Sequence, residues 1–139
     1  MMLGLGCDLC DVARIERALE RPRFLERVYT PAERARIARR GSETAAGLFA
    51  AKEAVSKALG TGIGEVGWKD IEILVDARGM PFVRLSENAR RAMQPSGGAA
   101  RVFVTITHVR SVAAATAAVE GEPAGQAQAP EKPLAGEEA

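Results

Sequence analysis

The chain has 139 residues and a hydrophobic content of 47%, which is enough for one domain with its own core and excludes a need for disulfides or a structural metal. Its formal net charge of +1 favours neither a nucleic-acid partner nor a membrane surface. Within this near-neutral total, nine Arg and four Glu lie between Arg14 and Arg40. This segment is either an ordinary solvated helical surface or a basic patch that attracts an acidic partner.

The two cysteines, Cys7 and Cys10, lie three positions apart, and the chain has a single histidine. This set forms neither a disulfide framework nor a zinc site. We therefore expect small, buried thiols in a reducing compartment. No segment has the pattern of a signal peptide or a membrane span, so the expected location is the cytoplasm.

The chain is expected to begin with a core strand over 2–7, which ends at Asp8 and is followed by a helix over 11–20. Pro22 is expected to stop this helix. Apolar residues recur at helical spacing on one side of the helix, and arginines gather on the other. The two sets are Val12, Ile15 and Leu19 on the apolar side and Arg14, Arg17 and Arg21 on the basic side.

Two further helices are expected, over 31–41 and 44–59. The first starts at Pro31, since Thr30 and Glu33 have the spacing of a capping box. In the second, an apolar stripe faces the core, and Gly60 lies just past the end. Phe49, Glu53 and Lys57 follow one another at four-residue spacing on a neighbouring face.

The rest of the chain is expected to be mostly β structure. Alternating apolar residues predict strands, polar and glycine-rich segments predict turns, and the C-terminal composition predicts disorder. The expected elements are strands over 68–76 and 81–85, a helix over 86–93, a loop over 95–98, a hairpin of strands 101–108 and 111–119, and a tail over 121–139. This order predicts an α+β domain over 1–120, in which helices cover one face of a mostly antiparallel sheet.

Several residues could carry chemistry, although each also has an ordinary structural interpretation. Asp8 and Glu53 could converge on a magnesium ion, which prefers one or two carboxylates together with phosphate oxygens and water. Alone, Asp8 is typical of a helix cap or turn, and Glu53 of a solvent-facing helical residue. Lys57 either pairs with Glu53 or lies beside a phosphate. His108, at a hairpin, is either structural or a ligand contact.

The glycine-rich segment Gly60-Thr61-Gly62 follows a helix rather than preceding one. The C-terminal end of a helix is the negative end of its dipole, which repels anions. A phosphate bound here would therefore need Lys57 and a metal ion to offset that field. The segment is not a phosphate loop of the strand-to-helix kind.

Two runs of the chain resemble signatures of one enzyme family. Gly4-Leu-Gly-Cys-Asp8, followed by Arg14, resembles the first signature of the small, holo-acyl-carrier-protein-synthase class of phosphopantetheinyl transferases. The run Phe49-Ala-Ala-Lys-Glu-Ala-Val-Ser-Lys-Ala-Leu-Gly-Thr-Gly62 resembles the second. The segments 68–73 and 105–108 are also similar, so the resemblance spans roughly residues 3–119.

The resemblance implies transfer of 4'-phosphopantetheine from coenzyme A (CoA) to a serine of an apo acyl carrier protein, within fatty acid and lipid biosynthesis. It implies a homotrimer of α+β subunits with active sites at the subunit interfaces. Asp8 and Glu53 would hold Mg²⁺, and with Lys57 form the catalytic set; Lys57, Gly60, Thr61, Gly62 and His108 would contact CoA; and Arg14, Arg17 and Arg21 would bind the acidic carrier protein. Glu53, acting through water, is one candidate for the base that takes the serine proton.

The chain departs from the family pattern at three positions. Leu48 stands where members usually carry Arg in contact with the coenzyme, Phe103 where His is common, and Val109 where a polar residue often follows the last His. Arg39 or Arg40 could compensate for Leu48. Two alternatives to the transferase therefore remain: a carrier-protein-binding module without turnover, and an unrelated α+β domain that binds a small molecule.

Overall fold

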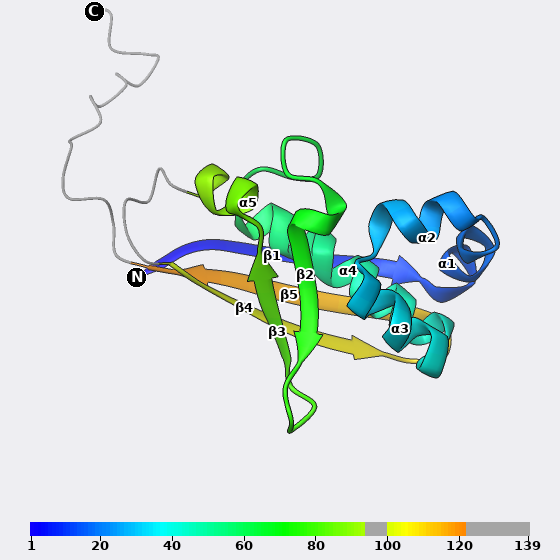
Figure 1. The fold of residues 1–139 in the computed structure, drawn as a ribbon. Helices are drawn as coiled ribbons and strands as arrows, with labels where there is room; N and C mark the ends of the chain where they lie inside the picture. The colour runs from blue at the N-terminus through cyan, green and yellow to red at the C-terminus, as the bar shows by residue number, and fades with distance from the viewer. Residues whose placement is uncertain (94–99, 122–139) are drawn as a thin grey trace, which may run out of the picture.

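The computed structural model describes residues 1–93 and 100–121. These residues contain two antiparallel sheets, five α-helices and a 3-10 helix (Figure 1). In chain order, the elements are β1 (Met2–Asp11), α1 (Val12–Leu19), α2 (Pro22–Val28), α3 (Pro31–Arg40), α4 (Ser42–Ala58), the 3-10 helix η1 (Trp68–Asp70), β2 (Ile71–Val75), β3 (Pro81–Leu85), α5 (Glu87–Ala92), β4 (Arg101–His108) and β5 (Val112–Glu120). The loop expected over 95–98 and the tail expected beyond 121 lie outside the described residues.

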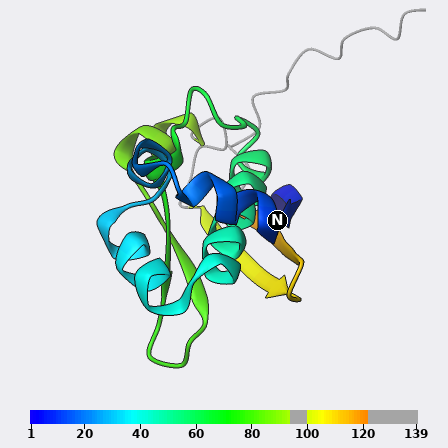
Figure 2. The same cartoon turned by 90° about the vertical axis from the view of Figure 1, so that its right-hand side faces the viewer.

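The larger sheet has three strands, in the order β1-β5-β4, and the smaller is the β2–β3 hairpin. Because β5 is central, β1 and β4 are the two edges of the larger sheet. In its register, Asp8 lies beside Ala115, and Ala115 lies beside Ile106. The hairpin crosses the larger sheet at a steep angle, and its turn projects from the body of the molecule (Figures 1 and 2). The predicted α+β class with antiparallel strands is therefore confirmed.

Helix α4 packs across one face of the larger sheet, and small side chains allow the two to approach closely. Alanines line both surfaces, including Ala113, Ala115 and Ala117 on β5 and Ala50, Ala51 and Ala54 on α4, all of them buried. Glycine extends this close packing to the edge strand. A Cβ on Gly4 or Gly6 would overlap the carbonyl oxygens of Ala58 or Ala54. The strand that carries Asp8 can therefore lie directly against α4.

The segment after α1 differs from the expectation. Pro22 ends α1, as predicted, but it is also the first residue of α2, where its missing N–H leaves no hydrogen bond unmade. Phe24 on α2 contacts Tyr29 edge-on, with 6.0 Å between the ring centroids. The first residues of the strand expected over 68–76 instead form η1.

A buried ion pair joins four elements, α3, α4, η1 and β2. Lys52 on α4 and Glu33 on α3 are both fully buried, with Nζ 2.7 Å from Oε1. The Lys52 ammonium also donates to the carbonyl oxygens of Trp68 and Ile71, at 2.9 and 2.7 Å. Glu33 accepts from the backbone N–H groups of Thr30 and Ile73. The pair therefore fixes α3 and the start of β2 against α4.

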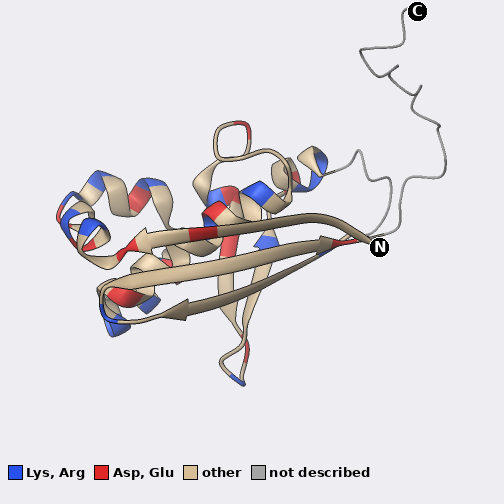
Figure 3. Cartoon of the chain, turned by 180° about the vertical axis from the view of Figure 1, so that it is seen from behind, with Lys and Arg blue, Asp and Glu red and all other residues tan. Residues whose placement is uncertain are grey.

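The other face of the larger sheet is not covered by any element of the described part of the chain. Figure 3 views the molecule from this side, and the strands there carry few charged residues. None of the described helices is long and apolar enough to span a membrane. Cys10 is buried as expected, but Cys7 is exposed on the uncovered face, because side chains on β1 alternate between the two faces.

Candidate active site

Asp8 and Lys57 meet where the edge strand β1 lies against the last turn of α4. The Lys57 ammonium lies 3.2 Å from Asp8 Oδ1 and donates to the carbonyl oxygen of Cys7 at 3.0 Å. The close packing at Gly6 makes this contact possible, since a Cβ there would also press on the Lys57 side chain. The glycines of the first signature therefore have a physical role, which sequence analysis did not identify.

Glu53, one turn before Lys57, belongs to the same cluster. Burial and the neighbouring Asp8 carboxylate raise its pKa, while Lys57 and Arg14 lower it, and the net pKa is above the ordinary value for glutamate. Two carboxylates that repel each other beside a lysine form a site that gains from a further positive charge. We refer to Asp8, Glu53 and Lys57 as the carboxylate–lysine cluster.

The donor set of this cluster fits magnesium. No group of three or more His, Cys, Asp or Glu residues that could hold a metal occurs in the described ranges. Two carboxylates are nevertheless the usual protein contribution to Mg²⁺ when phosphate and water complete the shell. The cluster is thus suited to a metal that binds together with a phosphorylated substrate, and unsuited to a structural zinc ion.

The segment Gly60-Thr61-Gly62 forms the C-terminal cap of α4. The N–H groups of Thr61 and Gly62 both donate to the carbonyl oxygen of Ser56, at 3.2 and 3.1 Å, and Gly60 N–H donates to that of Lys57. Gly60 and Gly62 have positive φ angles of 81° and 64°, which glycine adopts without strain. These N–H groups are therefore already used in capping the helix. Contact of the segment with CoA stays a prediction.

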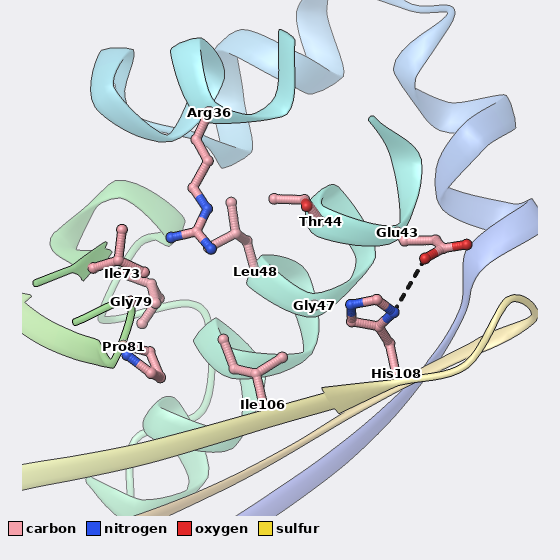
Figure 4. A pocket seen from close by; sticks show the side chains of 11 residues that line it. Arg36, Glu43, Thr44, Gly47, Leu48, Ile73, Gly79, Pro81, Ile106 and His108 are labelled. Atoms are coloured by element: carbon pink, nitrogen blue, oxygen red, sulfur yellow. Dashed lines mark ion pairs between the residues drawn. The ribbon is translucent and has the colours of Figure 1, made fainter. Parts of the chain in front are cut away.

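His108 lies in a separate pocket on the other side of α4 (Figure 4). Its Nδ1 is 3.1 Å from Glu43 Oε2, and both side chains are partly exposed. Residues of α3, of the β2–β3 hairpin and of β4 complete the pocket. They include Arg36, Ile73, Pro81 and Ile106, together with Leu48 of α4.

The pocket and the carboxylate–lysine cluster occupy opposite flanks of α4. Thr44 and Leu48 of the pocket each precede a residue of the cluster, Glu53 and Lys57, by nine positions. Nine positions are about two and a half helical turns, so the two pairs of side chains point to opposite sides of α4. The same separation exists in the sheet, since Asp8 lies on the edge strand β1 and His108 on the opposite edge strand β4. One chain therefore does not bring His108 to the predicted metal ligands.

The basic face predicted on α1 continues onto α2. Arg14 and Arg17 are exposed, as the sequence pattern predicted. A shallow hollow next to them is lined by Arg21, Arg23, Phe24 and Arg27. Arg23 and Arg27 belong to this face but were not predicted to, because no helix was expected after Pro22. Figure 3 shows Lys and Arg residues gathered at this end of the molecule.

Comparison with known proteins gives these features a common context. The family described as the 4'-phosphopantetheinyl transferase superfamily matches residues 4–116. The chain belongs to this family. It is 45% identical over 120 residues to the holo-[acyl-carrier-protein] synthase of Alkaliphilus metalliredigens, which covers 84% of this chain and 98% of the relative.

Solved structures of family members agree with the fold. The holo-[acyl-carrier-protein] synthase of Helicobacter pylori, crystallised in complex with coenzyme A, is 34% identical, with a TM-score of 0.75 over 84% of this chain and 99% of that one. The synthase of Bacillus anthracis, in complex with CoA (3',5'-ADP), is 37% identical, with a TM-score of 0.74 over 88% and 99%. Membership excludes the unrelated α+β domain considered above.

Proposed function

We propose that the chain transfers 4'-phosphopantetheine from CoA to a serine of an apo acyl carrier protein. The observation that carries this proposal is the carboxylate–lysine cluster: both carboxylates and the lysine of the two family signatures meet at one point, from β1 and α4. A binding module that had lost turnover would have no need of this cluster. The free thiols are consistent with a reducing cytoplasm as its location.

Asp8 and Glu53 would hold Mg²⁺ through their carboxylate oxygens. When bound, the ion would neutralise charge that develops on the phosphate oxygens and align the phosphate for attack. Lys57 would add a second positive charge to that phosphate. Its present contact with Asp8 keeps the ammonium at the cluster, and half of the side chain stays exposed to a ligand.

The reaction exchanges one phosphorus–oxygen bond for another. The carrier serine oxygen bonds to the phosphorus that bears the pantetheine arm, and the bond from this phosphorus to the adenosine bisphosphate oxygen breaks. The serine proton leaves to a base, for which Glu53 acting through water is a candidate, although metal ligation would lower its basicity. Such transfers depend mainly on positioning and charge neutralisation.

The carrier protein would dock on the basic face of α1 and α2. Arg14 lies close enough to Glu53 to lower the pKa of that carboxyl, so this face begins beside the carboxylate–lysine cluster. An acidic helix bound along Arg14, Arg17 and Arg21 would therefore bring its serine to the cluster. Arg23 and Arg27 on α2 would extend the same contact.

In a homotrimer, one active site would combine the carboxylate–lysine cluster of one subunit with the His108 pocket of a neighbouring subunit. CoA at the carboxylate–lysine cluster of one subunit would extend into the His108 pocket of the next. The uncovered face of the larger sheet supports such an assembly. Leu5, Leu9 and Phe103 there are 63%, 73% and 48% exposed, and a soluble monomer rarely leaves such side chains together in water.

Intact mass spectrometry tests the function. The protein would be incubated with an apo carrier protein, CoA and Mg²⁺, and a carrier with its acceptor serine changed to alanine would serve as the control. We expect a phosphopantetheine adduct on the first carrier and none on the second. Absence of the adduct from several carrier proteins, with binding retained, would instead establish a binding module.

A further inference from the structure

Arg36 on α3 points into the His108 pocket. Glu33, Arg36 and Ile37 lie on one side of α3, because residues three and four apart are neighbours on a helix. Glu33 and Ile37 are buried, so the Arg36 side chain is directed inward as well. In Figure 4, its guanidinium group lies between Leu48 and the strands that carry Ile73 and Pro81.

Among the described residues, no carboxylate compensates the charge of this guanidinium. Within residues 1–93 and 100–121, no acidic side chain forms an ion pair with Arg36, and its Nε is buried without a hydrogen-bond partner. Glu43, the acidic residue of the pocket, pairs with His108 instead. A buried donor without a partner costs free energy, and such groups are rare in native proteins.

The surroundings make this site selective for an anion. Burial, together with the positive charges of Arg40 and Arg39, lowers the pKa of Arg36 from its ordinary value, so a negative group would be strongly favoured there. Leu48, Ile73 and Ile106 line part of the pocket with apolar surface, and an ionic contact is stronger beside apolar surface than in bulk water. Arg39 and Arg40, which sequence analysis considered as replacements for the missing arginine, are exposed and do not line the pocket.

We propose that Arg36 binds the 3'-phosphate of CoA in this protein and takes over the role left open by Leu48. The inference rests on the proposed function. CoA carries a diphosphate, which the reaction requires at the carboxylate–lysine cluster, and one further phosphate, on the ribose. A phosphate bound in the pocket, on the other flank of α4, is therefore the ribose 3'-phosphate. The contact comes from α3, whereas the usual arginine comes from α4.

Steady-state kinetics with CoA and with 3'-dephospho-CoA test this assignment. For the wild-type protein, we expect removal of the phosphate to lower kcat/KM by about 10- to 100-fold, as for a lost charge-assisted hydrogen bond. Arg36→Gln should cause a similar loss with CoA, mainly through KM. It should have little effect with 3'-dephospho-CoA, because the two changes remove the same interaction.

Control variants separate this role from a structural one. Arg34→Gln removes the same charge from the same helix at a residue outside the pocket and should leave both substrates unaffected. Adding Leu48→Arg to Arg36→Gln should restore part of the preference for CoA. An equal effect of Arg36→Gln on both substrates, or no effect on either, would overturn the assignment.

A binding measurement distinguishes failure of this inference from failure of the proposed function. Calorimetry can measure the affinity of the protein for adenosine 3',5'-bisphosphate and for adenosine 5'-monophosphate, and this measurement does not depend on turnover. The wild-type protein should prefer the bisphosphate, and Arg36→Gln should lose that preference. Absence of any such preference in the wild-type protein would refute the inference even if transfer occurs. A preference without transfer would refute the function alone.

Discussion

Glu53 experiences two opposing electrostatic effects. Burial and Asp8 favour its protonated form, whereas Lys57 and Arg14 favour the carboxylate, and the net effect raises its pKa. A carboxyl whose pKa is raised on folding destabilises the folded state at pH values above that pKa, because the charged form is better solvated when the chain is unfolded. Bound Mg²⁺ would remove this penalty. The Glu53 carboxylate therefore destabilises the free protein, and under the proposed function Mg²⁺ binding would offset that cost.

Thermal unfolding at neutral pH tests this balance. In metal-free buffer, Glu53→Gln should raise Tm, because it removes a charge that folding disfavours. Added Mg²⁺ with adenosine 3',5'-bisphosphate should stabilise the wild-type protein much more than the variant. Equal ligand-induced shifts in Tm would mean that Glu53 does not hold the metal. Glu16→Gln on the exposed side of α1 serves as the control.

The same carboxyl predicts how activity depends on pH. When Mg²⁺ is below saturation, transfer should decline as pH falls toward the raised pKa of Glu53, because protons compete with Mg²⁺ for this carboxylate. Arg14→Gln should move this acid limb to higher pH, since Arg14 lowers the pKa of Glu53. Arg17→Gln should weaken carrier binding without moving the limb. Identical acid limbs for Arg14→Gln and the wild-type protein would contradict the predicted coupling.

Among the elements, α4 depends on a buried ion pair for its position. Lys52 and Glu33 together satisfy four backbone groups, on α3, η1 and β2, so removal of either partner leaves several buried groups unpaired. The pair also places α3, and with it Arg36, over the pocket. The burial of Lys52 lowers its pKa, while Glu33 opposes that change.

Urea denaturation tests the contribution of this pair. Lys52→Met should lower the free energy of unfolding by about 3–5 kcal/mol, the typical cost of leaving one buried charge unpaired. Lys52→Met combined with Glu33→Gln should recover part of that loss, because the double variant no longer buries the unpaired Glu33 carboxylate. A loss below about 1 kcal/mol in the single variant would contradict the description of the pair as a buried anchor.

Local sequence patterns predicted most elements but not how they meet. The capping box at Thr30 and the alternation of β2 are local signals, and the helix and strand were found there. Pro22 follows the end of α1 and is also the first residue of the seven-residue helix α2. Because proline was interpreted only as a helix terminator, α2 was not predicted. Asp8, Glu53 and Lys57 were candidates from their residue types alone, and the family signatures implied their roles. Arg36 gave no such signal, because its role depends on the packing of α3 over Leu48.

At the scale of the whole molecule, the central part of the uncovered sheet face forms three rows across the strands. The register places Leu5 beside Ala118 and Phe103, Cys7 beside Thr116 and Thr105, and Leu9 beside Ala114 and Thr107. The rows are free of charge and alternate with the residues that face α4. This face is the surface through which we expect three copies to associate.

Light scattering after size-exclusion chromatography tests this surface. If the proposed trimer forms through this face, Leu9→Glu should convert it to monomers, because association would bury an unpaired charge. Met80→Glu introduces the same charge at an exposed apolar residue on the β2–β3 turn and should leave the trimer intact. A Leu9→Glu variant that remains trimeric would exclude this face as the interface.

Thiol labelling gives a second measure of the same interface. Cys7 lies on the uncovered face, whereas Cys10 is buried and its pKa is raised to about 11, mainly by burial. Iodoacetamide should therefore modify Cys7 faster in the monomeric Leu9→Glu variant than in the trimer, and Cys10 slowly in both. Equal rates at Cys7 would count against its burial by association.

Activity of mixed trimers tests most directly whether one site is built from two subunits across α4. Glu53→Gln removes the metal side, and Arg36→Gln with His108→Ala removes the pocket side, so each variant alone should be nearly inactive at low CoA. Trimers assembled from an equal mixture should regain roughly a quarter of the wild-type sites, the fraction that random pairing leaves intact on both sides. No recovery in trimers shown by native mass spectrometry to be mixed would contradict the account.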